Sequence, residues 1–156
     1  MTIEDEIAFL EGIPILRRLG AAALRILAIS AEAYALETGQ VLFNTGDPAD
    51  GAFVIQHGSL ILTGPVGAAE VIAGPGTLLG ETALLVETIR PATARAREES
   101  TVLRISRSMF LRMLDGYPDA AARLSELFVA RTDQWARDLE NVRAAMLRAG
   151  ETPPQQ

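Results

Sequence analysis

The sequence contains no cysteine, no lysine and a single histidine, and each shortage excludes a class of function. Without cysteine, the chain has no disulfides, thiolate metal sites or cysteine nucleophiles. The 14 basic residues are all arginines, they form no basic block, and the net charge is −6, so direct nucleic-acid binding is not expected. His57 lies beside Gly58 with no second ligand-type residue at a metal-binding spacing, and we interpret it as structural. With neither metal ligands nor an activated nucleophile, we do not expect an enzyme such as a phosphodiesterase.

The chain also lacks any long apolar run. No segment approaches the ~20 apolar residues that span a bilayer, and the N-terminus, MTIEDE, does not have the positively charged start of a secretory signal. We therefore expect a soluble, cytoplasmic protein that makes no membrane contact. Its 156 residues, 49% hydrophobic and 22% charged, are typical of one globular domain, and we treat 1–156 as a single domain.

The apolar periodicity changes twice along the chain. Helical spacing at the N-terminus gives way to short β-rich runs between closely spaced glycine and proline turns, and helical spacing returns after Ser106, a predicted N-cap. Short strands with frequent turns are typical of a barrel or sandwich. The sequence predicts an α+β fold whose centre is a jelly-roll β-barrel, or double-stranded β-helix. The predicted parts are helices in 1–30 (4–11 and 20–29), the β-roll in 31–106 (strands near 31–36, 41–43, 53–55, 60–62, 92–96 and 101–105), helices in 107–149 (107–114 and 117–148), and a tail at 150–156 that we expect to be disordered.

A short helix is predicted inside the β-rich region, where the segment 79–86 (LGETALLV) has helix-forming residues after a glycine turn. The N-terminus of a helix presents free N–H groups, so residues Gly80 through Ala83 are expected to cradle a phosphate. Glu81 in the first turn can accept a hydrogen bond from a ribose hydroxyl. Arg90 can return as the counter-charge, because its planar guanidinium donates two charge-assisted hydrogen bonds to a phosphate. Together these residues predict a sugar-phosphate site.

The full motif is GETAL, five residues, then RPAT, and it spans residues 80–93. It resembles the phosphate-binding cassette of cyclic-nucleotide-binding domains, whose pattern is Gly-Glu-x-Ala-Leu, five residues, Arg-x-Ala-Thr. The turn and strand segments 39–43, 46–51 and Gly58 are also similar to that family, so the resemblance covers about residues 12–148. It implies a cyclic-nucleotide ligand and no further cofactor.

The resemblance also implies a role for individual residues of the cassette. Gly80 and Ala83 would donate backbone N–H groups to the phosphate, Glu81 would bind the ribose 2′-hydroxyl, and Arg90 would pair with the cyclic phosphate. The chain departs from the family directly after the arginine, because Pro91 has no N–H to donate. One missing donor is expected to weaken binding by about 1–3 kcal/mol. The predicted nucleotide-binding residues are Gly80, Glu81, Thr82, Ala83, Arg90, Pro91, Ala92 and Thr93.

Two of these residues have a plainer interpretation that the sequence leaves open. Arg90 could pair with Glu81 or Glu87 at the surface, where such a pair contributes little to stability. Thr93 could serve only as a strand residue. The spacing of the whole cassette favours the phosphate for Arg90.

The C-terminal helix carries an apolar heptad stripe that indicates a homodimer. In the related catabolite activator proteins this helix forms the dimer seam and reaches the base, and Trp135 stands where they have a threonine. An indole can stack on a purine but accepts no hydrogen bond, so base selectivity is expected to differ. The activators continue into a helix-turn-helix domain, which we do not expect here. The stripe is made of Phe128, Thr132, Trp135, Leu139, Val142 and Met146, of which Trp135 and Thr132 are the possible base contacts.

The sequence therefore predicts a regulatory sensor module, not an enzyme. It is expected to bind a cyclic purine nucleotide, with cAMP taken ahead of cGMP, and to signal through its C-terminal helix to an unknown protein partner. The alternative is a degenerate β-roll that has lost its ligand and serves as a scaffold for dimerisation or protein interaction, for which Pro91 and Trp135 are the evidence.

Overall fold

The computed structural model describes residues 2–64 and 69–126 of the chain. It begins with three helices, α1 (Ile3–Glu11), α2 (Pro14–Arg17) and α3 (Ala21–Ser30). A capping box between Thr2 and Asp5 starts α1, and a proline in the first turn starts α2. The two longer helices match the predicted segments 4–11 and 20–29, whereas α2 was not predicted as a separate helix.

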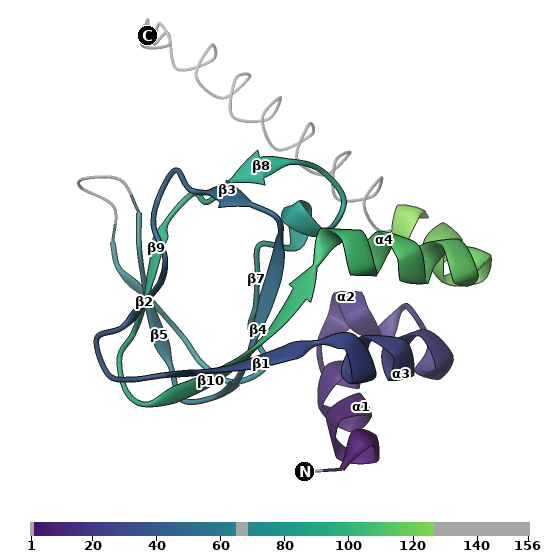
Figure 1. The fold of residues 1–156 in the computed structure, drawn as a ribbon, viewed down its shortest axis with the longest axis horizontal. Helices are drawn as coiled ribbons and strands as arrows, with labels where there is room; N and C mark the ends of the chain where they lie inside the picture. The colour runs from purple at the N-terminus through teal and green to yellow at the C-terminus, as the bar shows by residue number, and fades with distance from the viewer. Residues whose placement is uncertain (1, 65–68, 127–156) are drawn as a thin grey trace, which may run out of the picture.

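Two antiparallel sheets follow and enclose the interior of a β-roll (Figure 1). One sheet has the strand order β1-β10-β4-β7, the other β2-β9-β5-β6, and a small ladder joins β3 to β8. This arrangement confirms the predicted α+β jelly-roll fold. The strands are β1 (Glu32–Leu36), β2 (Val41–Phe43), β3 (Pro48–Ala49), β4 (Gly51–His57), β5 (Leu60–Thr63), β6 (Val71–Ala73), β7 (Leu78–Leu79), β8 (Thr88–Ile89), β9 (Thr93–Ala96) and β10 (Ser100–Ser106).

Strand β4 lies between two hydrophobic cores, and its sequence shows why. Phe53 and Ile55 face the interior of the roll, while Ala52 and Val54 face the helices on the other side of the sheet. Because both faces are covered, the strand has a continuous apolar sequence and not an alternating one. β4 thus joins the roll to the helical layer (Figure 1).

The helical layer is completed by α4 (Arg107–Gly116), which packs on α3. The Ser106 hydroxyl accepts a hydrogen bond from the Met109 N–H at 3.3 Å, so Ser106 is the predicted N-cap. Residues 118–126 are also helical, and the guanidinium of Arg123 fastens them to the end of α2 by donating to the Arg18 carbonyl at 2.7 Å. The rest of the helix predicted to end near residue 148 lies outside the described residues.

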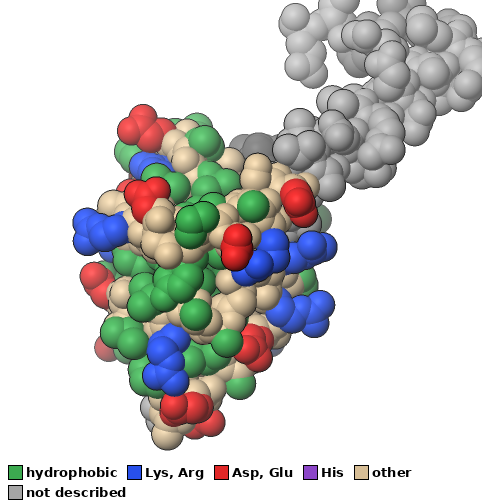
Figure 2. Space-filling model, turned by 90° about the vertical axis from the view of Figure 1, so that its right-hand side faces the viewer, with side chains coloured by type: hydrophobic (Ala, Val, Ile, Leu, Met, Phe, Trp, Pro, Cys, Tyr) green, Lys and Arg blue, Asp and Glu red, His purple; other side chains and the backbone are tan. Residues whose placement is uncertain are grey.

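The outer side of the helices carries apolar and charged side chains together (Figure 2). Ile26 and Ile29 of α3 and Leu111 of α4 are among the large apolar side chains that are exposed. Apolar side chains scattered among charged ones are common on protein surfaces and identify no site by themselves. Within residues 2–64 and 69–126, none of the helices is long and apolar enough to cross a membrane.

Candidate functional site

The backbone of Arg90 is held in place by the turn that follows β2. The Arg90 N–H donates to the Asp47 carbonyl at 2.8 Å, and the Gly46 N–H donates to the Arg90 carbonyl at 2.8 Å. The turn is itself closed by the Asp47 carboxylate, which accepts from the Asn44 N–H at 2.9 Å. The pairing of β3 with β8 continues this ladder. Two segments far apart in the sequence therefore fix the position from which the Arg90 side chain enters the fold.

The Arg90 side chain turns inward and is only 4% exposed. Its guanidinium carbon lies 4.5 Å from the ring centroid of Phe43 and 5.4 Å from that of Phe53. Nη1 is buried and has no hydrogen-bond partner in the structure. No ion pair of Arg90 is found in the described part of the chain, so the surface pair with Glu81 or Glu87 is not the arrangement observed. A buried donor without a partner is costly and marks a place where an acceptor can bind.

The electrostatics of Arg90 follow from this burial. Loss of hydration lowers the pKa of its guanidinium, with a smaller opposing contribution from Asp50. An arginine starts from so high a value that it keeps its charge at neutral pH. The site therefore contains a buried cation in a medium of low dielectric constant, where the attraction to an anion is stronger than in water.

Gly80 lies directly against this cation and has to be glycine for two reasons. Its φ of +82° is in the left-handed region that side chains rarely adopt. A Cβ at this position would also collide with Nη1 of Arg90. The backbone of the cassette thus approaches the guanidinium as closely as a residue without a side chain permits.

The predicted helix after Gly80 is a single 3₁₀ turn, Glu81–Leu84. The Ala83 N–H, which was expected to bind phosphate, donates to the Gly80 carbonyl at 3.0 Å. A single turn aligns few peptide dipoles, so the positive charge of the site comes mainly from Arg90. Glu81 is the first residue of the turn and is partly buried, and Thr82, the next residue, is exposed.

The three residues after Arg90 differ in burial and in role. Pro91 is exposed and Ala92 is partly buried. Thr93 begins β9, and its hydroxyl oxygen accepts from the Thr45 N–H at 3.0 Å and lies 3.1 Å from the Thr45 hydroxyl oxygen. Thr93 therefore has a structural role, which is to tie β9 to the turn that holds Arg90.

A second arginine, Arg107, links the cassette to the helical layer. From the first residue of α4, its Nη1 donates to the carbonyls of Ala83 at 3.2 Å, Val86 at 2.9 Å and Ala49 at 3.1 Å. These acceptors belong to the 3₁₀ turn, the segment after it and β3. Arg107 therefore holds three separate segments around the start of one helix.

Sequence reasoning did not find Phe43, Phe53 or Arg107. The position of Phe43, just before the turn at Gly46, was a possible signal, because a side chain that points inward from the end of this strand lies near the cassette. Nothing in the local sequence of Arg107 distinguishes it from a surface arginine in the first turn of a helix, because its acceptors are backbone carbonyls of distant segments.

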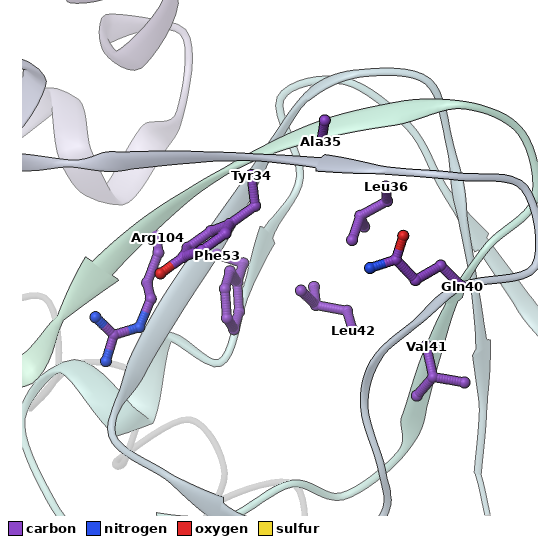
Figure 3. A pocket seen from close by; sticks show the side chains of 8 residues that line it. All are labelled: Tyr34, Ala35, Leu36, Gln40, Val41, Leu42, Phe53 and Arg104. Carbon is purple, nitrogen blue, oxygen red and sulfur yellow. The ribbon is translucent and has the colours of Figure 1, made fainter.

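A pocket of about 290 Å³ opens on another side of Phe53, between β1 and β2 (Figure 3). Two of its polar side chains already have partners, since the Tyr34 hydroxyl donates to Glu32 at 2.6 Å and Arg104 pairs with Asp50 at 2.6 Å. Phe53 lines this pocket and also contacts the guanidinium of Arg90. The lining residues are Tyr34, Ala35, Leu36, Gln40, Val41, Leu42, Phe53 and Arg104.

Several predicted residues fall beyond what the structure describes. Thr132 and Trp135, the possible base contacts, and the dimer-helix residues Phe128, Leu139, Val142 and Met146 lie outside the described residues. The single histidine, His57, is exposed at the end of β4. In residues 2–64 and 69–126, no group of three or more metal-ligating side chains is found.

The β-roll, the cassette against its rim and the buried arginine define a small-ligand-binding module, and comparison with known proteins identifies its family. A family model of the cyclic nucleotide-binding domain matches residues 34–117. A cyclic nucleotide-binding-like protein from Brucella abortus is 38% identical over 71% of this chain and 98% of its own, with a TM-score of 0.64. The chain belongs to the cyclic nucleotide-binding domain family, which is a family of regulatory domains.

Two further relatives show how the domain is used elsewhere. The N-terminal domain of a transcriptional regulator from Streptomyces coelicolor is 26% identical over 84% of this chain and 94% of its own, with a TM-score of 0.75. A lysophospholipase of Aspergillus terreus is 29% identical over 100 residues, which are 62% of this chain and 6% of that protein. The chain therefore spans only a small part of that enzyme.

Proposed function

We propose that the chain is a sensor module that binds a cyclic purine nucleotide through residues 80–93. The observation that carries the proposal is the buried guanidinium of Arg90, whose Nη1 has no partner and lies against Gly80. A cyclic phosphate supplies the charge and the acceptor oxygens that this group lacks. In this arrangement Glu81 binds the ribose 2′-hydroxyl. The proposal assigns no reaction to the chain.

We propose a preference for cAMP over cGMP, which would be set where the base binds and not at the arginine that pairs with the phosphate. The residues that the resemblance places against the base, Thr132 and Trp135, lie outside the described residues.

The proposed output runs through the helices that follow the β-roll. Arg107 joins the 3₁₀ turn to the start of α4, so a movement of the cassette on ligand binding is transmitted to that helix. A homodimer through the heptad stripe at 128–146 and a protein partner for the helix complete the proposed module.

Calorimetric titration with cAMP and then cGMP tests this function. We expect saturable binding of both, with cAMP the tighter ligand. Arg90→Met is expected to lose most of the binding. Its matched control is Arg95→Met, which removes an exposed arginine from the neighbouring strand β9 and is expected to bind like the parent. Absence of binding by a folded protein would overturn the proposal.

The second candidate is a scaffold that no longer binds a nucleotide. Two observations favour it: Pro91 has no N–H, and the Ala83 N–H is already bonded to the Gly80 carbonyl. The site then has fewer backbone donors for a phosphate than the cassette pattern supplies. For a scaffold we expect a melting temperature that does not respond to either cyclic nucleotide.

Replacing Arg107 with alanine is expected to loosen the cassette and lower the free energy of unfolding. The carbonyls of Ala49, Ala83 and Val86 would lose a charged donor, which corresponds to a loss of about 1–3 kcal/mol. Hydrogen exchange of the amides in 81–86 is expected to accelerate in Arg107→Ala and not in Arg112→Ala, which changes an exposed arginine of the same helix. Equal exchange in both variants would show that Arg107 does not hold the cassette.

A further inference from the structure

We propose that Phe43 and Phe53 are positioning residues that hold the guanidinium of Arg90 in place without accepting the N–H groups that a phosphate would bind. The inference rests on the proposed function and names the residues that set the affinity of that site. Phe43 ends β2 and Phe53 lies in β4, so the two rings come from different sheets. Their centroids are 5.9 Å apart, and both lie within cation–π distance of the guanidinium.

The neighbours of the Arg90 guanidinium are aromatic rings and not a carboxylate, and this difference matters for ligand binding. A carboxylate would stabilise the charge by accepting the same N–H groups that a phosphate needs. An aromatic ring attracts the cation through its face and accepts none of these hydrogen bonds in the plane of the guanidinium. Since Nη1 has no partner while the rings lie beside the guanidinium, the charge is stabilised and no acceptor of the protein is bonded to Nη1.

The rings also restrict the movement of the Arg90 side chain. A free arginine side chain has about 2 kcal/mol of rotamer entropy, part of which is lost when a ligand fixes it. Here the backbone hydrogen bonds with Gly46 and Asp47 fix the start of the side chain, and the rings fix its end. A phosphate therefore meets a guanidinium that is already oriented, which is preorganisation of the site.

The experiment compares Phe43→Leu with Phe43→Tyr in the full chain, using cAMP as the probe. If the ring no longer orders the side chain, part of the ~2 kcal/mol of arginine rotamer entropy is lost on binding instead, so we expect Phe43→Leu to bind cAMP up to about tenfold more weakly and Phe43→Tyr to bind like the parent. The control is Phe110→Leu, because Phe110 is a buried phenylalanine of the other core, 1% exposed. We expect it to lower the melting temperature without changing the cAMP affinity of the folded protein.

A second measurement separates positioning from direct contact between Phe43 and the nucleotide. In the ligand-free protein, the order parameter of the Arg90 Nε–H group, whose resonance is assigned by its absence in Arg90→Met, reports how rigidly the side chain is held. We expect Phe43→Leu to lower this order parameter and Phe43→Tyr to preserve it.

Each outcome decides the inference. Lost affinity with an unchanged Arg90 order parameter would overturn it in favour of direct contact, and an unchanged affinity in Phe43→Leu would overturn it as well. If the parent binds neither cAMP nor cGMP, the proposed function fails, whereas the Arg90 order parameter still reports whether the rings hold the guanidinium.

Discussion

Replacing Arg90 with methionine is expected to abolish most cAMP binding and, at the same time, to raise the melting temperature of the ligand-free protein. Two charge-assisted hydrogen bonds to the phosphate, each of about 1.5–3 kcal/mol, correspond together to more than a hundredfold in affinity. The opposite effect on stability arises because the guanidinium is 4% exposed and Nη1 is unpaired. Methionine removes the buried charge, fills much of its volume and packs well on the rings of Phe43 and Phe53.

The two effects are measured by calorimetric titration with cAMP and by thermal unfolding without ligand. Each kcal/mol gained in unfolding free energy is expected to raise the melting temperature by about 2–4 °C in a protein of this size. Arg95→Met, which changes the net charge equally at an exposed position, is expected to alter neither quantity. A lower melting temperature in Arg90→Met would mean that the contacts with Phe43 and Phe53 outweigh the cost of burying the charge.

Changing Gly80 to alanine is expected to reduce cAMP affinity more than tenfold, and Gly39→Ala provides a matched control. The two glycines have nearly the same positive φ, +82° and +85°, so both variants carry the left-handed strain of about 1–2 kcal/mol. At Gly39 the added Cβ meets nothing within 4 Å, whereas at Gly80 it collides with Nη1 of Arg90. The difference between the variants therefore isolates the close approach of Gly80 to the guanidinium.

Thermal unfolding and titration with cAMP again separate the two contributions. We expect both variants to lose a similar part of their stability to strain, and only Gly80→Ala to lose affinity because Arg90 is displaced. If both variants bind cAMP like the parent, then Gly80 is required for the turn alone and contributes nothing to the site.

The elements that could be predicted from the sequence are those with a pattern of their own. The strand at 41–43 and the N-cap Ser106 were predicted at the positions where they are found, because a β-rich run and a capping residue are local signals. β3 and β8 were not predicted, since each has two residues and exists only through its pairing with the other. β6, Val71–Ala73, was also missed, because three residues are too few to establish a period.

The same distinction holds within the candidate site. The cassette was recognised from its spacing, and the inward position of Arg90 agrees with the phosphate role that the spacing favoured over a surface ion pair. The aromatic partners were missed because Phe43 and Phe53 meet only when the two sheets close around the interior. The hydrogen bond that engages the Ala83 N–H depends on the turn being 3₁₀, which composition does not predict.

The bonds of Arg107 have a consequence for how the chain tolerates mutation. All three of its acceptors are backbone carbonyls, those of Ala49, Ala83 and Val86, so none of the bonds depends on which side chain stands there. Exposed positions of the cassette such as Val86 can then vary during evolution without breaking the link to α4. The link depends on one codon, that of Arg107, so substitutions at the exposed positions 82, 86 and 87 should leave the melting temperature nearly unchanged.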